Sequence, residues 1–390
     1  MKSVVRFASQ WGIAFFLLGA CSRPENEEAV KPADECLTQA SAANGRIIEG
    51  EYIVTYQTDG KEPVSAANAR LEVRSRTSSL LARHRIAASA IRQDLTGYGN
   101  GFAGKLTPAE AEDLRRDPAV AHVEPDRILS ISACFTVADT RRITWGVNRV
   151  GYGDGTGKTA WVIDTGIDLD HPDLNVDAAR SQSYVSGKTP DDDNGHGTHV
   201  AGIIGAKNNR IGTLGVASNA QLVSLKVMDN VGEGRLSNVI AAVGHVYRNG
   251  KPGDVVNMSL GGDVSQTLDN EVTRAAQRGI FFAVAAGNDA KSAALGSPSR
   301  VNNANVYTVS AMDSTGAWAR FSNFGNEVDY CAPGVRILST HKEGRYAYLS
   351  GTSMAAPHVA GLLLLNGGKL RTDGYVRNDP DGTPDPIAHR

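Results

Sequence analysis

The feature that most constrains the fold is an alternation, from about residue 144 onward, between short apolar runs and amphipathic segments. Strands that alternate with helices build a parallel sheet covered on both faces, so we predict an α/β fold with functional residues beyond the carboxyl ends of the strands. The apolar runs, rich in β-branched residues, predict buried strands at 159–164, 221–228, 254–260, 280–286 and 306–311. The segments with helical spacing of apolar side chains are 237–247 and 269–278.

Composition excludes several classes of protein. The 390 residues are 41% hydrophobic and 21% charged, which is enough for one large or two modest cores and excludes a disordered, fibrous or polytopic membrane chain. The formal net charge of −2 gives no general attraction to nucleic acid or anionic lipid. Four cysteines without a CxxC pair make neither a disulfide-dense scaffold nor a zinc site.

The N-terminus has the pattern of an export signal. Lys2 and Arg6 precede the apolar run WGIAFFLLGA, which is too short to span a bilayer. The run ends in Leu-Gly-Ala before Cys21, which resembles the lipobox of bacterial lipoproteins. The resemblance implies a lipoprotein signal peptide over residues 1–20 and acylation of Cys21, and the polar residues 21–45 are predicted to be a flexible tether. An ordinary signal peptide with a chance cysteine is the alternative.

Four polar residues lie where the predicted strands end and the predicted helices begin. Asp164 closes the apolar run WVID, and burial of a carboxylate is costly unless a donor such as an imidazole reaches it. His196 is flanked by glycines in NGHGTHVAG, and Ser353 lies among small residues in GTSMAAPHVAG, where its hydroxyl meets the positive end of a helix dipole. Asn288 follows the run FFAVAAG and offers an amide donor to an oxyanion. Together they predict nucleophilic catalysis by serine.

The blocks VIDTGID, NGHGTHVAG and GTSMAAPHVAG, in that order, resemble the three signatures of subtilisin-like serine peptidases (peptidase S8). WGVNRV and FSNFG resemble the proteinase K branch of that family. The resemblance implies a serine endopeptidase with a subtilisin-like three-layer sandwich over residues 134–368, built on a mostly parallel sheet. The resemblance also implies a role for each residue. Ser353 attacks the scissile carbonyl, and His196 takes the proton of Ser353 and later gives it to the leaving amine. Asp164 orients His196, and Asn288 holds the oxyanion together with the Ser353 N–H. This chemistry requires no cofactor.

The same resemblance implies how protein or peptide substrates bind. Two segments are expected to flank the substrate backbone as edge strands, and one leucine is expected to wall an outer subsite. These residues are Ser259, Leu260 and Gly261, then Gly232, Glu233 and Gly234, and last Leu236.

Residues 46–133 form a smaller unit with an α+β pattern. Strands are predicted at 51–57 and 119–131, a helix at 65–91, and a second helix after the capping box that begins at Thr107. The stretch GFAGKLTPAEAEDLRRDPAVAHVEPDR resembles the inhibitory I9-type propeptide of subtilisin-like proteases, a ferredoxin-like α+β domain. The resemblance implies an intramolecular inhibitor removed by self-cleavage within residues 130–139. A permanent accessory domain is the alternative.

Other residues of the signature blocks receive structural interpretations. His199 and His358 are predicted to be packing residues, and Asp168 and Asp173 to be solvated loop carboxylates. The run 191–193 of three aspartates is predicted to be a solvated acidic loop.

Structural calcium is possible, because the resemblance places Asp329 at a calcium-ligand position with carbonyl partners from residues 304–306. An ordinary capped aspartate is the alternative.

The remaining cysteines and the C-terminus leave alternatives open. Cys36 and Cys134 are candidates for a disulfide that keeps the lipid attached after cleavage, and Cys331 is predicted to be a buried free thiol. The family's usual closing helix is absent after about residue 365, and a polar tail, 369–390, takes its place. The tail is predicted to be flexible or docked on the surface, with a calcium loop in its Pro-Asp-Gly run as the alternative.

The sequence predicts an exported serine endopeptidase that is made as a zymogen. With acylation at Cys21 the lipid is its sole link to a membrane, in the periplasm or at the cell surface, and a released form can follow propeptide cleavage. Two rival functions are a pseudo-protease that binds peptides without cutting them and a structural lipoprotein. The intact set of polar residues argues against the first, and the propeptide has no use in the second.

Overall fold

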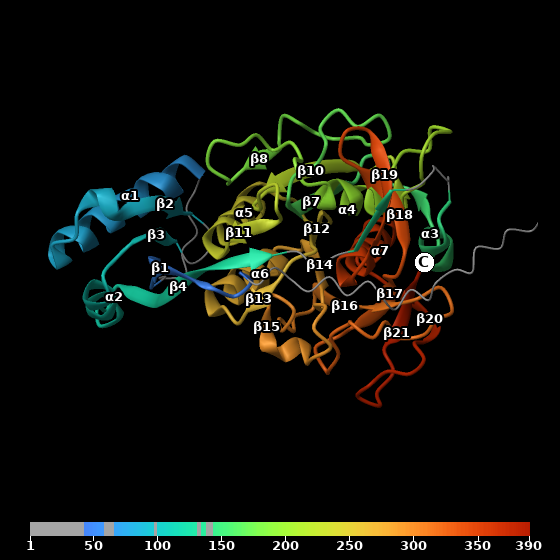
Figure 1. Cartoon of the computed structure of the whole chain (residues 1–390). Helices are drawn as coiled ribbons and strands as arrows, with labels where there is room; N and C mark the ends of the chain where they lie inside the picture. The colour runs from blue at the N-terminus through green and yellow to red at the C-terminus, as the bar shows by residue number, and fades with distance from the viewer. Residues whose placement is uncertain (1–42, 58–65, 97–99, 131–133, 138–142) are drawn as a thin grey trace, which may run out of the picture. The chain divides into compact units, whose positions relative to one another are not determined.

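A large, mostly parallel sheet carries the C-terminal part of the chain (Figure 1). Its strand order is β20-β21-β17-β16-β14-β12-β7-β10-β8, and every neighbouring pair is parallel except β20 with β21. The strands are β7 (Thr159–Asp164), β8 (Gln182–Ser183), β10 (Gln221–Lys226), β12 (Val255–Met258), β14 (Phe281–Ala285), β16 (Val306–Met312), β17 (Tyr330–Pro333), β20 (Arg371–Tyr375) and β21 (Pro386–His389). The five strands predicted from apolar runs are all present.

This computed structural model describes residues 43–57, 66–96, 100–130, 134–137 and 143–390. The signal peptide, Cys21, Cys36 and most of the tether lie outside the described residues, as does the side chain of Cys134. No helix among the described residues is long and apolar enough to cross a membrane.

Helices cover both faces of the sheet because its strands alternate their buried side chains (Figure 1). In β7, Ala160 and Val162 join the core cluster of one face, and Trp161 and Ile163 join the cluster of the other. The first cluster includes α4 (His196–Gly205) and α7 (Thr352–Asn366), and the second includes α5 (Leu236–Asn249) and α6 (Gln266–Gln277). The three-layer α/β architecture is as predicted.

The chain reverses direction across the sheet next to β7. From β7 it continues to β10 on one side and then to β12 on the other. A crevice forms outside the carboxyl ends of the strands at such a switch point. Asp164, the last residue of β7, lies at this place.

A second, antiparallel sheet carries the N-terminal unit, with its four strands in the order β4-β1-β3-β2. Its elements are β1 (Ile47–Tyr56), α1 (Ala66–His84), β2 (Ile91–Leu95), β3 (Gly101–Lys105), α2 (Pro108–Arg115) and β4 (Val120–Ser130). Thr107 and Glu110 form the predicted capping box at α2. Strand β2 was not predicted; α1 ends at His84 because Arg85 takes a left-handed conformation (φ 57°).

The N-terminal unit packs on the face that carries α5 and α6. Ile53 and Leu129 of its sheet belong to the same buried cluster as Leu236. Its side chains also serve the N-termini of both helices. Asp126 accepts hydrogen bonds from the Ser237 amide (3.1 Å) and hydroxyl (2.6 Å) in α5, and Glu124 accepts one from the Ser265 hydroxyl (2.9 Å) at α6.

Smaller elements complete the fold. A three-stranded sheet joins β18, β19 and β5, and two-stranded pairs join β13 with β15 and β6 with β9, while β11 adds to β4. The elements are α3 (Trp145–Val150), β5 (Cys134–Val137), β6 (Gly153–Asp154), β9 (Ala217–Ser218), β11 (Glu233–Arg235), β13 (Gly262–Asp263), β15 (Gly296–Ser297), β18 (Ile337–His341), β19 (Arg345–Ser350) and the short 3-10 helices Ala88–Ala90 and Ala293–Leu295.

The C-terminal tail belongs to the large sheet, which the sequence did not predict. Strand β21 pairs in parallel with β17 at Ile387 and Cys331, and β20 pairs with β21 at the sheet edge. Ile387 and Ala388 are buried. The tail is therefore docked rather than flexible.

Candidate active site

The carboxylate of Asp164 and the imidazole of His196 meet at the crevice beside β7. His196 Nδ1 lies 2.8 Å from Asp164 Oδ1, and both side chains are buried. His196 is the first residue of α4, and Gly195 before it has a φ of 116°. This left-handed conformation suits glycine and turns the ring toward β7. The predicted contact between these two residues is present.

Ser353 lies in the first turn of α7, and a proline inside that helix fixes its surroundings. Pro357 has no N–H, so it cannot donate to the Ser353 carbonyl four residues earlier. The Ser259 hydroxyl donates to that carbonyl instead (2.8 Å), and the Ser353 hydroxyl donates to the Ser259 carbonyl (3.2 Å). Ser259 therefore contacts Ser353 through two hydrogen bonds.

The second ring nitrogen of His196 is buried and has no hydrogen-bond partner among the described residues. The hydroxyl of Ser353 is directed to Ser259 rather than to His196. Hydrogen bonds between a nucleophile and its base are often loose before substrate binds. The structure thus joins Asp164 to His196 directly, and it joins Ser353 to Ser259, which follows β12, the strand that pairs with β7.

Asn288 follows β14 and is oriented by the residue before Ser353. Its side-chain carbonyl accepts hydrogen bonds from the Thr352 amide (2.8 Å) and hydroxyl (2.9 Å). Asn323 supports the same loop, since its amide donates to Ala286 O (3.0 Å) and its carbonyl accepts from the Asp289 amide (3.0 Å). Thr352 and Asn323 were not predicted as site residues, although both lie in stretches that resemble the family.

The last strand of the N-terminal unit lies in the cleft beside β11. Leu129 and Ser130 of β4 are opposite Gly234 and Glu233 in an antiparallel pair. Leu129 packs in the same cluster as Leu236, and a Cβ at Gly262 would lie 2.3 Å from its side chain. A peptide strand therefore occupies the edge that was predicted to bind substrate.

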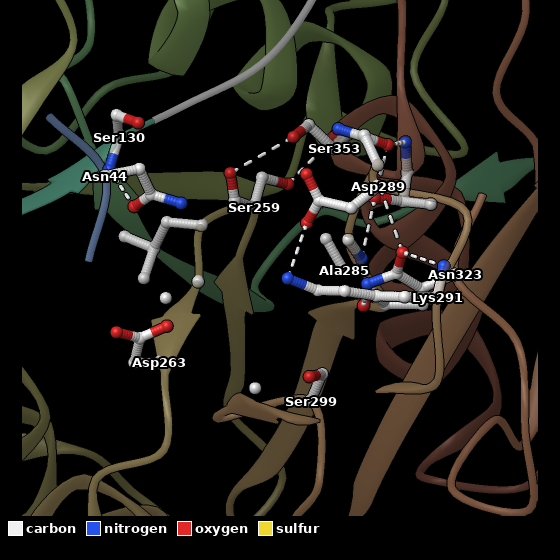
Figure 2. A pocket seen from close by; sticks show the side chains of 18 residues that line it. Asn44, Ser130, Ser259, Asp263, Ala285, Asp289, Lys291, Ser299, Asn323 and Ser353 are labelled. Atoms are coloured by element: carbon white, nitrogen blue, oxygen red, sulfur yellow. Dashed lines mark hydrogen bonds and ion pairs between the residues drawn. The ribbon is translucent and has the colours of Figure 1, made fainter. Parts of the chain in front are cut away.

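A pocket opens next to Ser130 (Figure 2), lined on its far side by Ala285, Asp289 and Ser299. Ser259, Leu260 and Gly261 line it as well. These are the residues predicted to form the second substrate-binding strand.

At one end of each predicted substrate-binding segment, the backbone does not pair with β4 as a strand would. The Ser130 amide donates to the Asn44 side chain (3.0 Å) and not to Gly261. Gly232 lies in the turn before β11, where its amide donates to Asp229 O (3.1 Å), so it is not part of the strand pair.

Three aspartates that were predicted to be solvated are buried, so that interpretation was wrong. Asp173 accepts from the Thr213 amide (2.9 Å) and Tyr346 hydroxyl (3.2 Å), and burial raises its pKa to about 6. Asp168 is 5% exposed, and burial raises its pKa too. Asp192 is 6% exposed, and its carboxylate accepts hydrogen bonds from the Gly195 and Thr198 amides at the N-terminus of α4.

The two histidines predicted to be packing residues, and the cysteine predicted to be a buried thiol, lie in the core. His199 is fully buried between the carbonyls of Ile337 and Ala347 (both 3.0 Å), and burial lowers its pKa to about 3. His358 is fully buried as well, and burial lowers its pKa to about 4. Cys331 is a buried free thiol.

No group of three or more His, Cys, Asp or Glu side chains in the described part of the chain is arranged to hold a metal ion. Asp329 accepts a hydrogen bond from the Thr308 amide (2.8 Å), and burial raises its pKa to about 6. A calcium site here would depend on backbone carbonyls for its other ligands.

Comparisons with known proteins agree with this geometry. The Subtilase family profile matches residues 155–367, and the Peptidase inhibitor I9 profile matches residues 51–132. Alkaline serine protease ver112 of Corniculantispora psalliotae is 35% identical over 96% of this chain and 97% of its own length. Alkaline serine exoprotease A of Vibrio alginolyticus is 42% identical over 68% of this chain, which spans 51% of that protein.

Among solved structures, a cold adapted subtilisin-like serine proteinase matches with a TM-score of 0.57 and 36% identity, covering 64% of this chain and 98% of its own. These matches confirm the predicted fold, the likeness to both families and the predicted class of enzyme. The chain belongs to the subtilase family of serine endopeptidases and carries a peptidase inhibitor I9 domain ahead of its peptidase domain.

Proposed function

We propose that this chain hydrolyses peptide bonds through Asp164, His196 and Ser353, with Asn288 at the oxyanion. Ser353 Oγ attacks the scissile carbonyl while His196 Nε2 takes its proton, and His196 then gives the proton to the leaving amine. Water repeats the sequence on the acyl-enzyme. The observation that carries the proposal is the 2.8 Å contact between Asp164 and His196 Nδ1, which leaves the buried Nε2 of the same ring without a hydrogen-bond partner among the described residues.

Stabilisation of the tetrahedral intermediate would come from two donors, the Ser353 backbone N–H and the Asn288 side-chain amide. Support comes from the two hydrogen bonds of Thr352, which fix the carbonyl end of the Asn288 side chain. A donor that is already oriented needs no rearrangement as negative charge develops.

We further propose that substrates lie between β11 and residues 259–261, as the end of β4 does on the β11 side. Peptide recognition would then use backbone hydrogen bonds to Glu233 and Gly234, with an apolar side chain in the position of Leu129 against Leu236. The resemblance to the family favours broad specificity for apolar or aromatic side chains at the cleavage site.

Maturation is proposed to proceed by self-cleavage within residues 130–139. Cys134, which follows residues 131–133, pairs with Ser350 in the β5–β19 ladder. Ser350 lies three residues before Ser353 in the sequence. Ser130, on the other side of residues 131–133, lines the same pocket as Ser353, which supports cleavage close to this junction. The cleaved I9 domain would remain as an inhibitor until it is degraded.

Export and a lipid anchor at Cys21 are also part of the proposal, and they rest on the sequence of the N-terminus alone. Mass spectrometry of the membrane fraction tests the anchor. A diacylglycerol-modified N-terminal cysteine is expected, and a free thiol at Cys21 or cleavage elsewhere contradicts it.

Calcium is proposed as a structural ion rather than a participant in catalysis. Asp329 remains the predicted ligand, and Asp173 is a further candidate because its Oδ1 and the Thr213 hydroxyl are buried without hydrogen-bond partners in the described residues. Chelation should then lower the unfolding temperature, and Asp173→Asn and Asp329→Asn identify the ligand by abolishing that response. No effect of chelation contradicts the proposal.

Titration of the purified mature protein with a covalent serine-directed inhibitor tests the catalytic proposal. One inhibitor per active molecule, attached to Ser353 and lost in His196→Ala, is the expected result. Binding of peptides without covalent capture would support the pseudo-protease instead.

A further inference from the structure

A lysine is buried beside the Asp164–His196 pair. Lys226 is the last residue of β10, and it is directly opposite Asp164 in the parallel pairing with β7. Its side chain is fully buried, with 0% exposed. Taking an ammonium out of water costs several kcal/mol unless partners compensate it, roughly at the scale known for buried ions. The partners of Lys226 therefore indicate why a lysine is present.

The ammonium joins two segments of chain that are far apart in sequence. Lys226 Nζ donates to the carbonyl of Thr165 and to Asp193 Oδ1, which lies 2.6 Å away. Thr165 follows Asp164, and Asp193 lies three residues before His196. One cation thus connects the backbone beside the carboxylate to the loop that leads into the histidine.

Asp193 is held firmly as the partner in this bridge. Its Oδ2 accepts from Lys188 (2.9 Å), and its backbone carbonyl accepts from Lys342 (2.8 Å). Burial raises the pKa of Asp193, but the hydrogen bonds from Lys226 and Lys188 outweigh it, so the pKa lies below its ordinary value. The carboxylate therefore stays ionised at neutral pH.

We propose that Lys226 is a positioning residue for peptide hydrolysis. Its ammonium holds the chain after β7 against the loop before α4, so that Asp164 Oδ1 keeps its contact with His196 Nδ1 while the ring gains and loses its proton. This inference rests on the roles proposed above for Asp164, His196 and Ser353. Lys226 does not touch the substrate, and its effect is exerted through the geometry of these two side chains.

The test compares Lys226→Met with wild type by kcat per titrated active site. Methionine fills similar space without a charge, so Lys226→Met loses the bridge between Thr165 and Asp193. Because a small displacement of the Asp164 or His196 side chain slows the chemical step, kcat is expected to fall about 10- to 100-fold. KM is expected to stay within about twofold, since ground-state binding does not involve this bridge. The low-field proton resonance of the His196–Asp164 hydrogen bond is expected to shift or broaden.

Lys188→Met is the matched control. Lys188 pairs with the other oxygen of the same carboxylate, is partly exposed, and does not contribute to the bridge between Thr165 and Asp193. Its kcat and its low-field resonance are expected to match wild type.

Three results would overturn the proposal. In Lys226→Met, wild-type kcat and an unchanged resonance together with a lower unfolding temperature would show a merely structural lysine. Equal losses in both lysine variants would mean that Asp193, not the bridge, matters. If Lys226→Met does not fold, Asp193→Asn takes its place, and unchanged kcat there contradicts the bridge. Wild type that lacks a titratable serine contradicts the underlying triad instead.

Discussion

At the scale of single residues, the proposed reaction depends on side chains that are oriented by hydrogen bonds with residues distant in sequence. Thr352 precedes Ser353 and holds the carbonyl end of Asn288 through two hydrogen bonds. Pro357 leaves the Ser353 carbonyl open to Ser259. The short sequence GTSMAAP therefore contains the proposed nucleophile, the proline that leaves its carbonyl free for Ser259, and the threonine that orients the proposed oxyanion donor.

Replacing Asn288 by alanine removes one oxyanion donor. We expect kcat to fall by roughly 10²–10³ with a small change in KM; this range is the one known for the equivalent change in subtilisin, not a value obtained from this chain. Steady-state kinetics on a peptide ester and a peptide amide measure it. Asn249→Ala, an exposed position at the end of α5, is the control. Wild-type kcat in Asn288→Ala would exclude Asn288 from the reaction.

The sequence predicted which residues lie at strand ends, but it did not predict which carboxylates are buried. Asp164 could be predicted because the apolar run before it shows where β7 ends. Asp173 could not, because its donors come from Thr213 and Tyr346, which are distant in sequence. Lys226 lies inside the apolar run predicted over residues 221–228, and its contacts with Thr165 and Asp193 appear only in the folded chain.

At the scale of elements, α5 receives its N-terminal cap from the I9 domain. Arg235 at its N-cap makes no side-chain capping bond, and Asp126 of β4 accepts from the Ser237 amide and hydroxyl instead. Arg92 pairs with the same carboxylate (2.9 Å). A helix of the peptidase domain thus donates hydrogen bonds to a side chain that the proposed maturation would remove.

Replacing Asp126 by alanine tests this dependence in the unprocessed Ser353→Ala chain. Loss of a helix cap costs about 0.5–2 kcal/mol, so the urea midpoint of unfolding should fall and refolding should slow. Asp113→Ala, an exposed aspartate of α2, is expected to change neither. An unchanged midpoint and refolding rate in Asp126→Ala would contradict the capping role.

Asp385, the residue before β21, makes stability depend on pH. Burial raises the pKa of Asp385 from 3.8 to about 7, and its Oδ2 accepts from the Ser310 hydroxyl (2.6 Å). The folded state therefore keeps a proton that the unfolded state has lost between these values. This stabilisation is complete below about pH 4 and disappears as the pH rises through about 7.

Asp385→Asn is expected to remove that dependence and to raise the unfolding temperature by a few degrees at pH 8, since the neutral amide has no charge to bury. Thermal unfolding of the unprocessed Ser353→Ala chain from pH 4 to 8 measures it. Asp381→Asn, exposed in the same loop, should keep the wild-type slope. Parallel curves for Asp385→Asn and its parent would contradict the assignment.

Elements with a clear apolar period were predicted, and elements without one were missed. Strands β7, β10, β12, β14 and β16 are buried on both faces, so their sequences are continuous apolar runs. Strand β2 is at the edge of its sheet and follows a helix of similar composition. Strand β20 is exposed along its whole length, so its polar sequence carries no strand signal.

At the scale of the whole molecule, the I9 domain and the peptidase domain contact each other beside the candidate active site. The final residues of β4 pair with β11 and lie next to the pocket that contains Ser353 (Figure 2). The sequence predicted an inhibitory domain ahead of a peptidase domain, but the pairing of Leu129 with Gly234 could not be predicted because it joins segments about a hundred residues apart. In the described residues, the end of the I9 domain thus lies on the strand and beside the pocket that are proposed to bind substrate.

The measurement that tests the central claim most directly is the intact mass of the purified protein, for wild type beside Ser353→Ala. Wild type is expected to have lost the whole segment that ends within residues 130–139, while Ser353→Ala keeps it, because the proposed self-cleavage requires that serine. Equal processing of both proteins would show that another protease removes the I9 domain. Retention of the segment in both would favour a pseudo-protease with a permanent N-terminal domain.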